Sequence, residues 1–231
     1  YAYNFHLCPT KFEIQNNLVA DEILVTGNKL KKHIKKYSSN INVSSAPAFR
    51  FYNSFEKRKI KKSDLYLIVL PIDINHSKLI IDFLISIFDE IKIQNDNLHF
   101  KLHPTINKND FIKKHPNFNN LNFTDKKLDE IILDYKVVLG NSSSTLMESL
   151  MYGIPVINLP SFSGFDSNPI PSEIDNNIFR LCKDRIEVIK AIKHFNKNSE
   201  TKRKLYQKIG ENIRINYFDN VDFNSVQKFI N

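Results

Sequence analysis

The sequence predicts an α/β fold built on a doubly wound parallel sheet. Short runs rich in β-branched residues alternate with amphipathic stretches of helical spacing, and this alternation is typical of a parallel sheet covered by helices. The composition, 42% hydrophobic and 25% charged, is that of a folded globular protein, and 231 residues suffice for one large or two small cores. No apolar run approaches the roughly 18 residues that a membrane-spanning helix needs.

The first part of the chain contains one strand and one helix before a connecting segment. We expect residues 21–27 to form a strand and turn, residues 28–37 a basic amphipathic helix, and residues 42–51 an extended crossing segment. A mostly basic run follows and is interpreted as a linker. The expected organisation is therefore an N-terminal part, a linker and a larger unit, over residues 1–50, 51–62 and 63–231.

From residue 65 onward the alternation is regular. The expected strands cover residues 65–70, 98–103, 121–124, 137–139, 156–159 and 179–182, and the expected helices cover residues 75–91, 110–114, 127–133, 184–195 and 199–215. Asn75 or Ser77 is expected to cap the first of these helices. A further helix of about two turns is expected to end at Gly153, where glycine favours termination.

A hydroxyl-rich turn precedes that short helix. Residues 141–145 read Asn-Ser-Ser-Ser-Thr, and their side-chain oxygens can cap the helix, whose free N–H groups and dipole attract phosphate. Glu148 lies one helical turn after Ser144, so it can reach toward ribose hydroxyls. The segment has the layout of a nucleotide-binding half-site; a capped helix with a solvent-facing glutamate is the alternative.

A histidine ends the strand at residues 98–103. Pro104 stops the strand and leaves the His103 imidazole at its carboxyl edge, where ligands bind in open parallel sheets. A histidine in this place can donate a hydrogen bond to a phosphate oxygen. The alternative is an ordinary loop histidine.

These motifs together resemble a known family. Lys101-Leu102-His103-Pro104, the serine-rich turn and Glu148 with the following Gly153-Ile154-Pro155 resemble the Rossmann-like C-terminal, donor-binding domain of GT-B glycosyltransferases. The resemblance is nearest to bacterial enzymes of capsule and lipopolysaccharide synthesis. Within that group, an HP motif and a serine-rich motif are features of enzymes with cytidine-activated donors, such as sialyltransferases, Kdo transferases and the related glycerophosphotransferases of teichoic acid synthesis.

The resemblance implies roles for individual residues. His103 and the serines would contact the donor phosphate, Glu148 would contact the ribose, and no metal would be required. The substrate-binding set is then His103, Pro104, Asn141, Ser142, Ser143, Ser144, Thr145 and Glu148. His103 would also stabilise the departing phosphate, which makes it a catalytic candidate. Asp73 is the in-chain candidate for the base that activates the acceptor, with turn formation as its alternative use.

Two departures from the family bear on the catalytic base. The chain lacks the Asp/Glu-Asp/Glu-Gly triplet that supplies the base in many of the sialyltransferases. A two-domain enzyme of this type also needs substantially more than 231 residues, so the chain is interpreted as a fragment that retains the end of an acceptor-binding domain. The base is therefore expected from the other domain.

The expected function is transfer of a sugar from a nucleotide-activated donor, of the CMP-linked sialic acid or Kdo type, to a bacterial surface glycan. The expected partners are that donor and a glycan or lipid-linked acceptor, with no cofactor and no nucleic acid. The alternatives are a nucleotide-sugar epimerase of the same fold and a non-catalytic nucleotide-binding or scaffold domain.

The isolated Cys8 and Cys182 favour a reducing, cytoplasmic compartment. The net charge of +8 and the lysines of residues 29–36 suit contact with anionic lipids at the inner face of the membrane, and a solvated helix face is the alternative.

Overall fold

The computed structural model describes residues 8–55, 63–141, 143–162, 168, 170–197 and 199–230. Two parallel sheets organise it. The large sheet has six strands in the order β5-β4-β3-β6-β7-β8, and the small sheet pairs β1 with β2. The strands are β1 Ile23–Val25, β2 Val43–Ser45, β3 Tyr66–Val69, β4 Leu98–Lys101, β5 Asn122–Phe123, β6 Val137–Gly140, β7 Val156–Asn158 and β8 Phe179–Leu181. The helices are α1 Lys11–Gln15, α2 Asn28–Tyr37, α3 Ile74–Ile91, α4 Lys108–Lys114, α5 Leu128–Ile131, α6 Ser144–Met151, α7 Arg185–Asn196, α8 Glu200–Tyr217 and α9 Phe223–Ile230, with 3-10 turns at Phe49–Phe55, Asn95–Asn97, Pro116–Phe118 and Ile132–Asp134.

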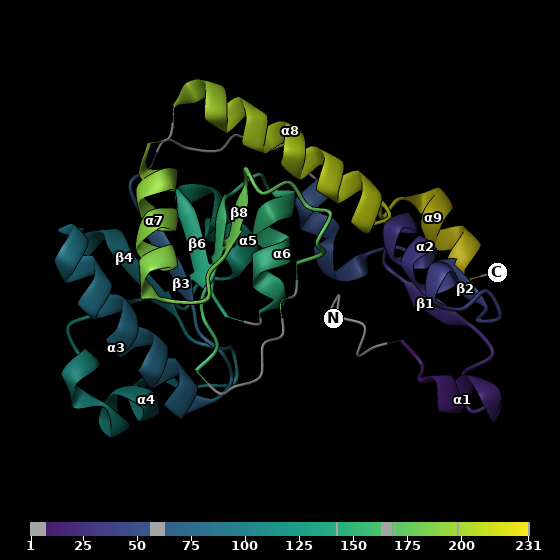
Figure 1. Cartoon of the computed structure of the whole chain (residues 1–231), viewed down its shortest axis with the longest axis horizontal. Helices are drawn as coiled ribbons and strands as arrows, with labels where there is room; N and C mark the ends of the chain where they lie inside the picture. Colours follow the sequence, from purple (N-terminus) through teal and green to yellow (C-terminus); the bar gives the residue numbers. More distant parts are fainter. Residues whose placement is uncertain are drawn as a thin grey trace.

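The large sheet is wound in two directions from its centre. Strand β3 pairs in parallel with β4 on one side and with β6 on the other. The chain therefore runs outward from β3 to β4 and β5, returns to β6, and runs outward again to β7 and β8. Figure 1 shows α3 and α7 on one side of this sheet and α5 and α6 on the other. The predicted fold class, a doubly wound parallel sheet, is confirmed.

The core lies on both faces of the large sheet. Every residue of β3 and β6 is buried, as expected for central parallel strands that read as continuous apolar runs. Phe88 and Ile81 of α3 and Phe100 of β4 are fully buried in the same core. This packing fixes the carboxyl ends of the central strands relative to one another.

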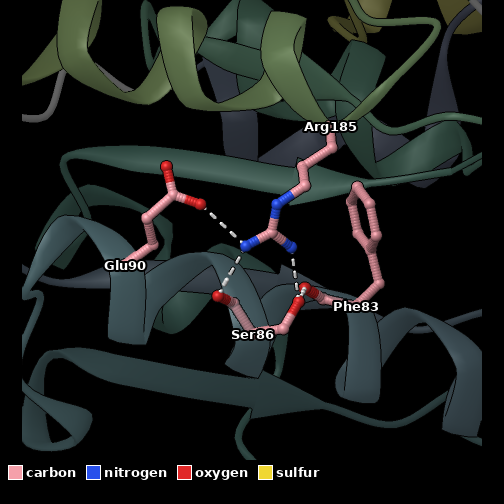
Figure 2. Close-up of polar contacts among 4 residues, drawn as sticks. All are labelled: Phe83, Ser86, Glu90 and Arg185. Atoms are coloured by element: carbon pink, nitrogen blue, oxygen red, sulfur yellow. Dashed lines mark hydrogen bonds and ion pairs between the residues drawn. The ribbon is translucent and has the colours of Figure 1, made fainter.

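Polar contacts also join the helices on one side of the sheet. Arg185, at the start of α7, donates to the Ser86 hydroxyl at 2.6 Å and to the Ser86 carbonyl at 2.9 Å, and it pairs with Glu90 at 2.8 Å (Figure 2). The Ser86 hydroxyl donates in turn to the Phe83 carbonyl at 2.7 Å. These contacts hold α7 along α3.

Two predicted helix boundaries can be compared with the structure. Gly153 follows α6 with a φ of +76°, a left-handed conformation that glycine adopts readily, so its predicted role in ending the helix is confirmed. The predicted cap of α3, Asn75 or Ser77, is wrong. Asp73 caps that helix by accepting from the His76 N–H at 2.9 Å, and the buried Ser77 donates instead to the Pro71 carbonyl at 3.0 Å.

The small sheet has a modest core of its own. Ile34 of α2 packs with Ile41 and Val43, while Leu24 of β1 remains 48% exposed. The strand β2 lies within the segment that the sequence predicted to be only an extended crossing. The limits of the predicted N-terminal part remain a prediction, and residues 56–62 of the predicted linker lie outside the described residues.

The C-terminal end of the chain returns to the small sheet. The Asp219 N–H donates to the Thr26 carbonyl, and the Ala48 N–H donates to the Asp219 carbonyl at 3.0 Å. The helix α9, which the sequence did not predict, then lies beside the small sheet, since Asn224 and Ser225 of α9 line one cavity with Leu24 of β1 (Figure 1). Residues from both ends of the sequence therefore build this part of the molecule.

Among the residues that the structure describes, no helix combines the length and apolar character needed to cross a membrane.

Candidate functional site

A cavity of about 820 Å³ opens at the carboxyl edge of the large sheet, beside the ends of β3, β4 and β6. Because the chain winds in opposite directions from β3 and β6, this edge is the switch point at which α/β sheets bind ligands. Eight of the nine predicted site residues line the cavity, namely Asp73, His103, Pro104, Asn141, Ser143, Ser144, Thr145 and Glu148. The ninth, Ser142, lies outside the described residues.

A glycine lets the two central strands approach closely at this edge. A Cβ atom on Gly140 would lie 2.5 Å from Cγ2 of Val69 and 3.1 Å from the Val69 carbonyl oxygen. Any larger residue would push β6 away from β3 at the point where the chain enters α6. Gly140 therefore sets the position from which α6 starts at the cavity.

The N-terminus of α6 forms one wall. Ser143 is its N-cap, and the Ser143 hydroxyl accepts from the Thr145 N–H at 3.3 Å. Ser143, Ser144 and Thr145 all line the cavity. The free N–H groups of the first turn and the positive end of the helix dipole therefore lie at the cavity, an arrangement that favours a phosphate.

His103 lies on the opposite wall, in the turn after β4. Its Nδ1 accepts from the Thr105 N–H at 3.3 Å and lies 2.7 Å from the Thr105 hydroxyl. In the neutral ring, an accepting Nδ1 places the proton on Nε2. This contact therefore favours the tautomer with the proton on Nε2, where it is available for a ligand.

Glu148 lies half-buried one turn into α6. The pKa of its carboxyl is raised to about 7, mainly by burial; the positive charge of Arg50 opposes this shift and the negative charge of Asp129 adds to it. Near neutral pH, Glu148 is consequently present in both protonation states. The protonated form can donate a hydrogen bond as well as accept one, which suits a partner bearing hydroxyl groups.

Two predicted site residues make strong contacts within the protein. The bond from the His76 N–H to Asp73 lowers the pKa of the exposed Asp73 carboxyl, which makes it a weaker base than an ordinary aspartate. The buried Asn141 donates its amide to the carbonyls of Leu159 and Pro160, at 2.8 and 3.1 Å, and thereby joins the end of β6 to the end of β7. Only the carbonyl oxygen of its side chain is left for a ligand.

Other residues of the cavity wall were not predicted from the sequence. Arg50 reaches the cavity from the segment before β3, and its guanidinium donates to the Ser144 hydroxyl at 3.4 Å. Lys101 is the last residue of β4 and Asp125 closely follows β5, so their places at the carboxyl ends of these strands were a usable signal. The ammonium of Lys101 donates to the Lys126 carbonyl at 2.6 Å, and burial lowers its pKa. No local signal points to Arg50.

No protein-family model and no curated protein sequence matches the chain. Solved structures match it in fold. The pneumococcal O-GlcNAc transferase GtfA, in complex with UDP and GlcNAc, matches with a TM-score of 0.52 and 15% identity over 95% of this chain and 46% of its own. The structure of accessory secretory protein 1, 2 and 3 from Streptococcus pneumoniae matches with a TM-score of 0.58 and 13% identity, over 91% of this chain and 43% of that chain. S. aureus MnaA with UDP matches with a TM-score of 0.59 and 14% identity, over 99% of this chain and 63% of its own.

The chain thus spans less than half the length of the two streptococcal proteins that it matches. With sequence identities of 15% or lower, the likeness establishes the fold. The chain has the Rossmann-like α/β fold found in glycosyltransferase structures, with its cavity at the edge of the sheet where such folds bind nucleotides.

Proposed function

We propose that the cavity binds a nucleotide-activated sugar and that this chain is the donor-binding part of a GT-B glycosyltransferase acting on a bacterial surface glycan. The observation that carries the proposal is the meeting of His103, the α6 N-terminus and Glu148 around one cavity at the switch point. A phosphate fits the first two groups and a ribose fits the third. The UDP in the GtfA and MnaA structures supports a nucleotide as the ligand.

The proposed chemistry is stabilisation of charge on the departing phosphate. The Nε2–H of His103 and the N–H groups at the start of α6 are fixed before the ligand arrives, so they can stabilise negative charge without reorganising. This set of donors supports transfer without a resident metal ion. Because the hydrogen bond from His76 lowers the basicity of Asp73, we assign the acceptor-activating base to residues outside this chain.

For the donor we propose a cytidine-activated sugar, with the HP and serine-rich motifs as the support. A uridine-activated sugar is the competing donor, because UDP is the nucleotide named for the two neighbours. The lysine-bearing helix α2 further supports contact with anionic lipids, where lipid-linked acceptors reside.

Calorimetric titration of the chain with CMP, CDP, UDP and GDP tests both the nucleotide site and the preference for a cytidine nucleotide. We expect binding of at least one nucleotide, with CMP or CDP tightest, and a loss of about 10- to 100-fold in affinity in His103→Ala, because a hydrogen bond to a charged phosphate is removed. Lys32→Gln, on the exposed face of α2, is the control and should bind like the wild type. Preference for UDP would reject the cytidine donor, and wild-type affinity in His103→Ala would reject the phosphate role of this histidine.

A further inference from the structure

Arg50 is the feature of the cavity that neither the motifs nor the fold anticipates. It comes from the segment between the small sheet and β3, yet it lines the cavity and its guanidinium contacts Ser144 at the start of α6. We propose that Arg50 binds the phosphate of the donor and transmits that binding to the junction between the small and large sheets. This inference rests on the proposed nucleotide site.

The position of Arg50 is set by the packing of its own segment. The guanidinium lies 5.5 Å from the centre of the Phe51 ring, and Phe51 packs edge-on against Phe218 with ring centres 4.6 Å apart. Phe218 directly follows α8, and Asp219 accepts the Ala48 N–H at 3.0 Å. The arginine is therefore anchored where the C-terminal end of the chain meets the small sheet.

The chemistry of the guanidinium fits a phosphate better than its present partner. Among the residues that the structure describes, its one hydrogen bond, to the Ser144 hydroxyl at 3.4 Å, uses one of five N–H donors, and the side chain is exposed. A phosphate held at the first turn of α6 would lie beside Ser144, within reach of the same guanidinium. Arginine can then make two parallel charge-assisted bonds to phosphate oxygens, which are stronger than the bond to the neutral hydroxyl.

The electrostatic setting supports the same assignment. The positive charge of Arg50 acts on the half-buried Glu148, which lies on the next turn of α6. An arginine placed only to neutralise Glu148 would not need to contact Ser144 at the helix start. Arg50 instead lies near both Glu148 and the N-terminus of α6, the two groups proposed to bind the ribose and the phosphate of one nucleotide.

The first test separates the phosphate from the nucleoside. The nucleotide that the wild type binds most tightly among CMP, CDP, UDP and GDP is titrated by calorimetry, and its nucleoside is measured by ligand-detected NMR. We expect Arg50→Gln to weaken nucleotide affinity by about 10- to 100-fold and to leave nucleoside affinity unchanged. Glu148→Gln should weaken both ligands, and Lys32→Gln neither.

Unchanged nucleotide affinity in Arg50→Gln, or an equal loss for nucleotide and nucleoside, would overturn the assignment while the nucleotide site itself stands. If the wild type binds none of the four nucleotides, the proposed function fails first. Circular dichroism and thermal unfolding of each variant show whether it is folded, and Arg50→Lys, which keeps the charge but loses the fork, should fall between the wild type and Arg50→Gln.

The second test concerns transmission to the junction. Hydrogen exchange at the Ala48 and Asp219 amides should slow when nucleotide is added to the wild type, because both amides lie on the segment contacts that hold Arg50. In Arg50→Gln at saturating nucleotide, this slowing should be absent. Slowing that persists in the variant would show that the junction responds to the nucleotide without the arginine, and would overturn this part of the proposal.

Discussion

The two parallel sheets of this molecule differ in how far their strands are buried. In the large sheet, β3 and β6 are buried on both faces, and helices cover each side. In the small sheet, Ile34, Ile41 and Val43 form a cluster on one face, and Leu24 on the other face is 48% exposed. The difference teaches that the large sheet is rigid enough to hold a preformed site, whereas the small sheet depends on contacts from the end of the chain.

A matched pair of cavity-forming substitutions tests this difference most directly. We expect Ile81→Ala, in the core of the large sheet, to lower the free energy of unfolding by about 4 kcal/mol, near the upper part of the range for such changes. Ile41→Ala, in the small cluster, should cost about 2 kcal/mol because its surroundings border solvent and can relax. Urea unfolding measures both values.

Hydrogen exchange completes this comparison. Ile41→Ala should raise exchange in residues 23–45 and leave the strands of the large sheet protected, while Ile81→Ala should raise it throughout the large sheet. Equal losses of stability, or exchange that rises together in both sheets, would mean that the two cores unfold as one unit.

The half-buried carboxyl of Glu148 tests how a charged group at the cavity affects the stability of the protein. Because the folded protein keeps a proton on Glu148 up to a pKa of about 7, whereas an unfolded glutamate loses it near 4.5, the wild type loses stability as the pH rises across this window. Glu148→Gln should be about as stable as the wild type near pH 4.5 and more stable by about 3 kcal/mol at pH 8.

The control for this substitution is Glu22→Gln, at an exposed site next to the small sheet, which should leave stability unchanged at both pH values. Urea unfolding at pH 4.5 and pH 8 gives the comparison. A Glu148→Gln protein whose stability follows the wild type at all pH values would show that the Glu148 carboxyl titrates normally.

The smallest expected effect is at the surface contact of α3 with α7. Glu90→Gln should lower stability by less than about 1 kcal/mol, because the Arg185 and Glu90 side chains are 40% and 51% exposed. The bonds from Arg185 to Ser86 remain in this variant (Figure 2). The difference from the wild type should vanish in 1 M salt. A loss of stability larger than about 1 kcal/mol would mean that the ion pair, more than the apolar core, stabilises the contact between α3 and α7.

The alternation of strands and helices could be read from the sequence because each element leaves a local pattern. The order of the strands could not, since β3 pairs with β6 only after the chain has made two other strands. The small elements β2 and α9 were missed for a related reason. Their patterns are short, and β2 forms only by pairing with β1, some 20 residues earlier in the chain.

The residues of the site, too, could be predicted only where a local sequence pattern places them. His103, Ser143 and Glu148 could be predicted to share a cavity, because each follows a strand at the carboxyl edge of one sheet. Asp73 was not predicted as a helix cap, because Asn75 and Ser77 are equally suitable by residue type. Arg50 lies 94 positions from Ser144, and only the packing of its segment brings the two together.

The return of the chain end to the small sheet has a consequence for biosynthesis. Residues 23–45 leave the ribosome well before Tyr217 and Asp219, which form hydrogen bonds with Thr26. At ordinary rates of translation this interval is roughly 10 to 30 s, during which the large sheet can already form from consecutive segments. The small sheet is therefore synthesised before the large sheet but completed after it, and a nascent chain that stops before Tyr217 would expose an incomplete small sheet to chaperones and proteases.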